Sequence, residues 1–189
     1  MYNGARIILA SQSPRRKQLL EQAHIPFEVR VVATAETFPD GMPLPAVPVH
    51  IALQKADAVR DICTPEDIIL AADSVVIIDD LVIGKPKDRA DAMQILSRLS
   101  GRAHEVITGV VIRQGSRQHT FSNTTTVHFK PLDADHLAFY VDHYKPYDKA
   151  GAYAIQEWIG AVGIDRIAGC FYNVMGLPVS EVVRVLEQW

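Results

Sequence analysis

The sequence predicts a mixed α/β protein, because strand-like and helix-like patterns follow one another along the whole chain. Short apolar runs such as residues 6–10 and 68–72 indicate buried strands. Apolar residues at helical spacing, as in residues 48–62 and 88–99, indicate amphipathic helices. Hydrophobic residues make up 48% and charged residues 22% of the 189 residues, which is ordinary for a globular protein with a real core. We therefore expect one domain over residues 1–189.

The beginning of the chain predicts a strand, a tight loop and a helix. Residues 6–10 form the strand, and Ser13 followed by Pro14 supplies an N-cap and a first helical residue. Arg15 and Arg16 then stand in the first helical turn, where cations oppose the helix dipole. A bound anion would reverse that sign, so we favour a phosphate site here over two solvent-exposed arginines.

The next segment predicts a strand, a loop and a helix. Residues 27–33 alternate as a strand does, whereas residues 34–48 contain four prolines and indicate a loop with Glu36 near its start. A helix is expected over residues 48–62, with Lys55 beside its apolar stripe. Taken alone, Glu36 is a solvated loop residue and Lys55 a surface lysine with a buried stem.

Residues 68–86 place a carboxylate among apolar segments. Asp73 ends the first apolar run, and residues 75–78 and 81–83, separated by two aspartates, predict a β-hairpin. A buried carboxylate needs a partner, because an unpaired charge is costly or shifts its pKa. These residues alone leave open whether Asp73 has a function or satisfies backbone N–H groups at a strand end.

The second half of the chain continues the alternation. Residues 148–156 combine small and polar residues and resemble the lining of a site, whereas residues 158–167 are expected to be irregular and apolar. The other expected elements are a helix at 88–99 capped by Asp88, strands at 106–113 and 120–129, a helix beginning at Asp133 or Asp135, and a helix at 179–188.

Composition and missing motifs exclude several classes of protein. A formal charge of −3 argues against stable, non-specific nucleic-acid binding. Cys63 and Cys170 lie far apart, which fits a reduced cytoplasm and does not fit a zinc site. No segment has the length of a signal peptide's apolar part or of a transmembrane span, so we expect a cytoplasmic protein without membrane contact. P-loop, GxGxxG and GxSxG motifs do not occur.

The chemically useful groups outside the periodic core are cations and carboxylates. Cations that hold polyphosphate, with carboxylates that hold a divalent metal and a water, suit phosphoanhydride hydrolysis. Spacing alone leaves their convergence open. The groups are Arg15, Arg16, Lys55, Lys85 and Lys149, with Glu36, Asp73 and Asp148.

Seven short motifs occur in order: SxSPRR at residues 11–16, ADS at 72–74, GKP at 84–86, LSG at 99–101, TGV at 108–110, DKAGAYxIQ at 148–156 and NVxGLP at 173–178. Together they closely resemble the Maf-like nucleotide pyrophosphatase family, and they cover nearly the whole chain. The DKAGAYxIQ segment resembles the branch that acts on dTTP and UTP, rather than the 7-methyl-GTP branch.

The resemblance implies a single Maf-like domain with an elongated mixed β-sheet in two α/β lobes and a cleft between them. It implies an enzyme that clears pyrimidine triphosphates, including modified ones, by hydrolysing them to the monophosphate and diphosphate. A divalent cation, Mg²⁺ or Mn²⁺, is the implied cofactor. The implied partners are the small nucleotide substrate and a second copy of the chain in a homodimer.

The resemblance also implies roles for individual residues. Asp73 matches the family's proton acceptor, and Glu36 with Asp73 would hold the metal. Gln156 offers both a donor and an acceptor, as the imide edge of thymine or uracil requires. The implied catalytic residues are Asp73, Glu36, Lys55 and Lys85, and the implied substrate-binding or specificity residues are Ser11, Ser13, Arg15, Arg16, Ser74 and Gln156.

Three positions depart from the family pattern, and two other functions stay open. Ser74 stands where the family commonly has Thr, Cys170 where it has Ser, and Ala35 where many relatives have an acid, which weakens the expected metal site. One alternative is a nucleotide-binding regulator of cell division without relevant turnover. The other is a purine or 7-methyl-GTP pyrophosphatase.

Overall fold

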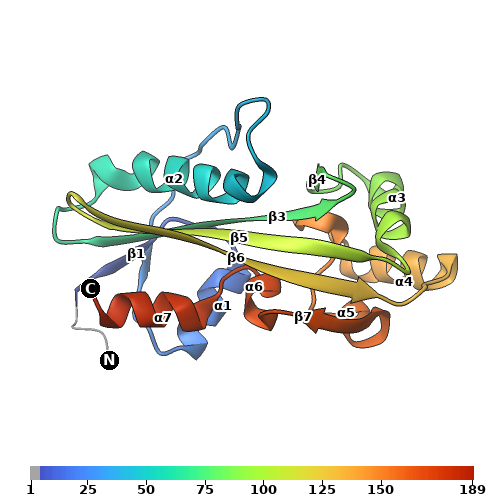
Figure 1. Cartoon of the computed structure of the whole chain (residues 1–189). Helices are drawn as coiled ribbons and strands as arrows, with labels where there is room; N and C mark the ends of the chain where they lie inside the picture. The colour runs from blue at the N-terminus through green and yellow to red at the C-terminus, as the bar shows by residue number, and fades with distance from the viewer. Residues whose placement is uncertain (1–4) are drawn as a thin grey trace. The chain divides into compact units, whose positions relative to one another are not determined.

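The structure, a computed structural model, describes residues 5–189 and confirms the predicted mixed α/β class (Figure 1). Its strands form one mixed sheet in the order β2-β1-β3-β5-β6-β7, with β4 paired to β3. The strands are β1 (Ile7–Leu9), β2 (Glu28–Val29), β3 (Ile68–Ile78), β4 (Leu81–Ile83), β5 (Ala103–Gln114), β6 (Arg117–Phe129) and β7 (Ile164–Ala168).

The chain divides into two compact units. Among the described residues, unit 1 comprises those up to Asp73, Thr108–Asn123 and Gly176–Trp189, and unit 2 comprises Ser74–Ile107 and Thr124–Met175. The division falls inside β3, β5 and β6, so each of these strands contributes one part to each unit.

Unit 1 is built on parallel strands covered on both faces. β1 pairs in parallel with β2 and with β3, in the register Ile8 to Glu28 and Ile8 to Ile69. Figure 1 shows α2 on one face of these strands and α1 and α7 on the other. The helices are α1 (Pro14–Gln22), α2 (Val47–Val59) and α7 (Val179–Glu187), with 3-10 turns η1 (Leu44–Ala46) and η2 (Arg60–Ile62).

Small residues bring α2 close to the sheet. Ala52 and Ala56 of α2 pack with Ile69 and Ala71 of β3 in one buried cluster. A Cβ atom at Gly109 on β5 would lie 2.3 Å from the backbone nitrogen that follows Pro48, so no larger residue fits there. The TGV motif therefore fixes the start of α2, the helix that carries Lys55.

The end of the chain docks on the β5–β6 hairpin of unit 1. The Arg117 guanidinium lies over the Trp189 ring, 4.1 Å from the ring centroid. The Trp189 indole nitrogen donates to the Gln114 side chain at 3.0 Å. These contacts hold the C-terminal residue against the hairpin turn.

Unit 2 contains the predicted hairpin, and the conformation of its two turn residues explains why the hairpin forms. β3 and β4 pair antiparallel, and Asp79 and Asp80 between them have φ of 53° and 55°, as a two-residue type I′ turn requires. β6 and β7 pair antiparallel as well. The helices are α3 (Arg89–Leu99), α4 (Ala134–Tyr144), α5 (Trp158–Gly163) and α6 (Phe171–Met175), with the 3-10 turn η3 (Ala150–Ala152).

A buried histidine joins the DKAGAYxIQ segment to β5. His104 stacks on Phe129 and meets Tyr153 edge to face, with its Nε2 atom 2.8 Å from the Tyr153 hydroxyl. Burial lowers the pKa of His104 to about 4, with a smaller contribution from the charge of His128. His104 is therefore a neutral hydrogen-bonding partner at neutral pH.

The structure corrects three expectations. The second strand covers only Glu28–Val29 rather than residues 27–33, because its partner β1 is three residues long. Residues 158–167 are not irregular: they form α5 and β7. Asp73 does not end a strand but lies inside the continuous β3. Within residues 5–189, no helix is both long and apolar enough to cross a bilayer.

Candidate active site

Three of the predicted catalytic residues meet in unit 1. The Lys55 ammonium lies 2.7 Å from a carboxylate oxygen of Asp73 and 3.0 Å from one of Glu36. The side chains of Lys55 and Asp73 are only 15% and 14% exposed, whereas Glu36 is 45% exposed. The buried carboxylate that the sequence predicted to need a partner therefore has one, and it comes from α2.

The loop that carries Glu36 is held against α2. The Gln54 side chain, next to Lys55 in the chain, donates to the Thr37 carbonyl at 2.7 Å. Glu36 itself has φ of 50°, a left-handed conformation that costs a non-glycine residue free energy. Such strain is typical of functional positions, and here it accompanies the ion pair of Glu36 with Lys55.

The start of α1 gives its two arginines different environments. Ser13 caps the helix by accepting from the Arg16 backbone nitrogen at 3.4 Å. The Arg16 guanidinium donates to the Gly176 carbonyl at 2.8 Å and to the Ser11 hydroxyl at 3.1 Å. Arg16 is 8% exposed, and Arg15 is half-buried. Arg16 thus joins the SxSPRR motif to the NVxGLP motif, a role that the sequence did not predict.

Electrostatics connects this helix end to the carboxylates of unit 1. Burial lowers the pKa of the Arg16 guanidinium, and the negative charges of Asp73 and Glu36 oppose that decrease. Arg16 and Lys55 therefore balance the charge of two carboxylates within unit 1.

The carboxylates of unit 1 are few for a divalent cation held by protein groups alone. Within residues 5–189, no group of three or more His, Cys, Asp or Glu side chains is placed to hold a metal ion. Glu36 and Asp73 supply two carboxylates around one ammonium. Mg²⁺ is commonly bound by one or two carboxylates together with substrate phosphates. The residues present therefore fit a hard cation whose other ligands come from a phosphate chain.

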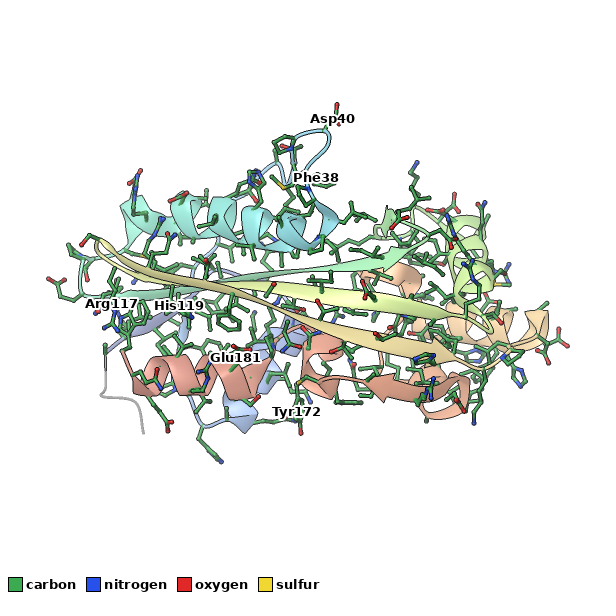
Figure 2. The ribbon with its side chains drawn as sticks, in the orientation of Figure 1. Phe38, Asp40, Arg117, His119, Tyr172 and Glu181 are labelled. Carbon is green, nitrogen blue, oxygen red and sulfur yellow. The ribbon has the colours of Figure 1, made fainter. Side chains whose placement is uncertain are left out.

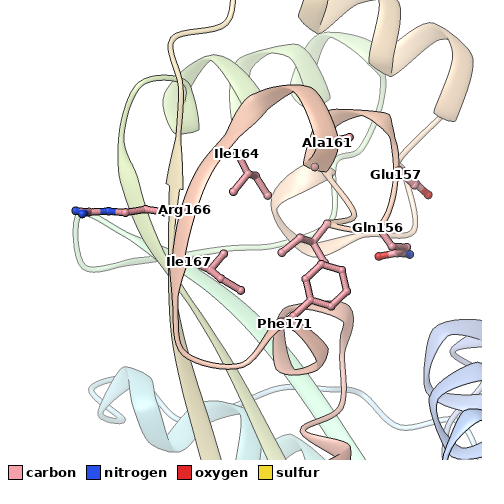
Figure 3. A pocket seen from close by; sticks show the side chains of 9 residues that line it. Gln156, Glu157, Ala161, Ile164, Arg166, Ile167 and Phe171 are labelled. Carbon is pink, nitrogen blue, oxygen red and sulfur yellow. The ribbon is translucent and has the colours of Figure 1, made fainter.

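The predicted specificity residue Gln156 lines a pocket in unit 2. The pocket has a volume of about 500 Å³, within the usual range of small-molecule sites of roughly 300–1,000 Å³. Figure 3 shows Ile164, Ile167 and Phe171 pointing toward one another, whereas Arg166 points away. The pocket therefore combines apolar walls with the amide of Gln156.

A hydrogen-bonded network fixes the segment on both sides of Gln156. The Tyr140 hydroxyl accepts from the Ala154 backbone nitrogen at 3.1 Å and donates to the Glu157 carboxylate. Lys149, which is 8% exposed, lies 2.7 Å from Asp148 and 3.6 Å from Glu157. The cation and acid of the DKAGAYxIQ motif are thus engaged with each other and with Glu157.

The other two predicted site residues of unit 2, Ser74 and Lys85, are not among the residues that line this pocket. Ser74 is half-buried on β3 and Lys85 is exposed. The Gly151 nitrogen donates to the Gly84 carbonyl at 3.1 Å, which ties the GKP motif to the DKAGAYxIQ segment.

Sequence reasoning missed Phe171 as part of the pocket wall. The motif that begins at Asn173 lies just after it and does not include it. The sequence signal that could have indicated it is the aromatic pair Phe171 and Tyr172 between Gly169 and the buried Asn173. Gly169 has φ of 133°, and a Cβ atom there would lie 2.7 Å from the Thr125 hydroxyl.

The chain is similar to proteins of one known family along nearly its whole length. The Maf-like protein family matches residues 6–189. A protein of Bacteroides fragilis (strain YCH46) named dTTP/UTP pyrophosphatase is 43% identical over 184 residues, covering 97% of this chain and 95% of the relative. A protein of the same name from Porphyromonas gingivalis (strain ATCC BAA-308 / W83) is 46% identical over 187 residues, covering 97% and 94%. Among solved structures, the Staphylococcus aureus Ham1 protein is 13% identical with a TM-score of 0.49, covering 66% of this chain and 71% of that one.

Proposed function

The chain belongs to the Maf-like protein family, and on that premise we propose that it hydrolyses dTTP and UTP to the monophosphate and diphosphate. The observation that carries the proposal is the cluster of Glu36, Lys55 and Asp73 in unit 1. Two carboxylates on one ammonium suit an enzyme that activates water beside a polyphosphate. The two relatives named dTTP/UTP pyrophosphatase, at 43% and 46% identity, support this choice of substrates.

In this proposal Asp73 is the general base. The attacking water gives its proton to the Asp73 carboxylate as its oxygen bonds to phosphorus, and the bond to the leaving phosphate chain breaks. Lys55 holds the carboxylate in place through its 2.7 Å contact. General-base catalysis typically contributes about 10²–10⁴-fold to the rate.

Glu36 and Asp73 would hold the divalent cation, Mg²⁺ or Mn²⁺. The cation supplies Lewis-acid neutralisation of phosphate oxygens. Lys55 sits between the two carboxylates and keeps them from repelling each other. The exposed Lys85 adds a further cation for the phosphate chain.

Phosphate binding is assigned to the start of α1. Ser13 and Arg15 stand at the N-terminal end of α1, where the helix dipole favours an anion, and Arg15 adds a charge-assisted donor. Ser11 and Arg16 support this helix end, because the Arg16 guanidinium donates both to the Ser11 hydroxyl and to the Gly176 carbonyl.

Base selection is assigned to Gln156, with Ser74 as a second specificity position. Thymine and uracil present an N3–H between two carbonyls, whereas cytosine presents an unprotonated N3 beside an amino group. The Gln156 amide offers one donor group and one acceptor. A site built for one pattern leaves polar groups unpaired with the other, so UTP should be preferred over CTP.

The proposal also includes the compartment and the oligomeric state. Cys63 and Cys170 are free thiols, which fits a reduced cytoplasm. A homodimer is retained from the family resemblance.

The test is a panel of nucleoside triphosphates with diphosphate detection at catalytic enzyme concentration. We expect release from dTTP and UTP, little from CTP, ITP, XTP or 7-methyl-GTP, and complete loss with EDTA that Mg²⁺ or Mn²⁺ reverses. Nucleotide binding without diphosphate release would instead support the regulatory alternative. Full activity after exhaustive chelation would remove the metal from the proposal.

A further inference from the structure

Phe171 is a large aromatic side chain that unit 2 leaves partly in solvent. It is 39% exposed and forms a wall of the pocket that Gln156 also lines. Behind this wall, Ile164 and Ile167 pack against the buried cluster of Val76, Val106 and Val127. The apolar side of the pocket is therefore backed by a packed core.

The backbone on both sides of Phe171 is fixed by a fully buried threonine. The Cys170 backbone nitrogen donates to the Thr125 hydroxyl at 3.0 Å, and that hydroxyl lies 3.2 Å from the Cys170 carbonyl. The Asn173 amide donates to the same hydroxyl at 2.9 Å and to the Val106 carbonyl at 3.0 Å. Thr125 and Asn173 have no solvent exposure. Phe171 is thus an exposed ring mounted on a rigid support.

The opposite edge of the pocket is equally constrained. A Cβ atom at Gly160 would lie 1.7 Å from the Ile155 carbonyl, so α5 packs directly on the backbone that precedes Gln156. Glu157 is engaged with Tyr140 and lies near Lys149. Its carboxylate is therefore committed inside the unit.

These features select the chemistry of an occupant. The lining supplies apolar walls, one aromatic ring and the Gln156 amide, and it also includes Glu157 and Arg166, the second of which points away in Figure 3. A flat heteroaromatic ring with a donor and acceptor edge suits the walls, the ring and the amide, because its face can stack and its edge can bond to the amide. A purely aliphatic ligand would leave the amide unpaired.

We propose that Phe171 is the surface on which the pyrimidine base of the substrate stacks, while Gln156 reads the edge of the base. Thr125 is a positioning residue, because it acts through Cys170 and Asn173 on the placement of Phe171. This inference rests on the proposed nucleotide substrate and assigns a residue that the sequence motifs did not. Stacking does not distinguish thymine, uracil and cytosine, because each has a π face.

The neighbouring Tyr172 provides a matched control. It is 48% exposed and meets Phe171 edge to face with ring centroids 5.6 Å apart, but it is not among the residues that line the pocket. Figure 2 shows it pointing away from the sheet. Replacing either aromatic removes a similar exposed surface, and only one replacement removes the proposed stacking face.

The experiment measures KM and kcat for dTTP, UTP and CTP in the unaltered protein and in Phe171→Ala, Phe171→Leu, Phe171→Tyr and Tyr172→Ala. Loss of one base–aromatic stack should raise KM about tenfold for each nucleotide, within a range of roughly 5- to 150-fold. Phe171→Ala and Phe171→Leu should show that increase with the UTP to CTP preference unchanged. Tyr172→Ala should stay within about twofold of the unaltered protein, and Phe171→Tyr, which keeps an aromatic face, should raise KM less than Phe171→Leu does.

The positioning role of Thr125 has its own readout. Thr125→Val should raise KM in the same direction, and the double variant with Phe171→Ala should be no worse than Phe171→Ala alone. Melting temperatures identify folded variants, and Phe171→Leu against Phe171→Tyr decides the question if Phe171→Ala fails to fold. Equal KM values for Phe171→Leu and Tyr172→Ala, in a protein that does hydrolyse dTTP, would overturn the inference and leave the proposed function intact. No hydrolysis by the unaltered protein would overturn the proposed function itself.

Discussion

The two units hold their candidate residues in contrasting ways. In unit 1, Lys55 joins Glu36 and Asp73 through ion pairs of 3.0 and 2.7 Å. In unit 2, Gln156 and Phe171 line a largely apolar pocket, and the nearby Ala154 and Cys170 backbone nitrogens donate to the buried hydroxyls of Tyr140 and Thr125. Charge suits a phosphate chain and proton transfer, whereas a rigid, mostly apolar surface suits a base. In the function proposed above, unit 1 therefore carries the general base, and unit 2 carries the selection of the base together with one cation, Lys85.

The largest effect on the rate of hydrolysis is expected from a substitution of Asp73 in unit 1. Asp73→Asn keeps the shape but cannot accept a proton at neutral pH, so single-turnover hydrolysis of dTTP should fall at least about a hundredfold. The asparagine oxygen can still accept a hydrogen bond from Lys55. We therefore expect the variant to fold and bind dTTP, with no gain in stability, because the carboxylate that is removed was paired.

Asp57→Asn is the matched control for that change. Asp57 lies on α2 of the same unit, is 53% exposed and pairs with Arg113. It should keep the normal rate, because an exposed pair contributes little. A folded Asp73→Asn protein with at least half the normal single-turnover rate would remove Asp73 from the mechanism and make Glu36 the next candidate.

A second, smaller effect separates the two arginines of α1. Arg15→Ala should remove a charge-assisted phosphate contact of about 1.5–3 kcal/mol and lower kcat/KM about equally for all triphosphates, at a nearly unchanged melting temperature. Arg16→Ala should instead destabilise the fold by roughly 1–3 kcal/mol, because the buried Gly176 carbonyl loses its partner. Thermal unfolding and kinetics on the same preparations measure both. The reverse pattern would exchange the two roles.

Local signals explain why much of the fold was predictable. Asp88 and Asp133 cap α3 and α4 as expected, and Asp79 with Asp80 forms the predicted hairpin turn. α5 was missed because its glycine-containing sequence gives a weak helical pattern. Caps and turns act over a few residues and leave a local pattern, whereas contacts between distant segments do not.

The candidate site was harder to predict from the sequence than the fold, because its contacts join distant segments. Lys55 and Asp73 lie on a helix and a strand that only tertiary packing brings together, so spacing could not predict their contact. Family resemblance named both residues, and the structure adds that they pair. The burial of Arg16 and the support of Phe171 by Thr125 depend on partners 160 and 45 residues away from Arg16 and Cys170. Neither leaves a local sequence pattern.

The most direct measurement of the division between the units is the ratio of kcat/KM for UTP to that for CTP. It should be compared among the unaltered protein, Glu36→Gln in unit 1 and Gln156→Ala in unit 2. Glu36→Gln should lower both values and leave the ratio unchanged, because phosphate and water carry no base identity. Gln156→Ala should reduce the ratio by about tenfold, the effect of roughly one hydrogen bond. A changed ratio in Glu36→Gln, or an unchanged ratio in Gln156→Ala, would contradict the account.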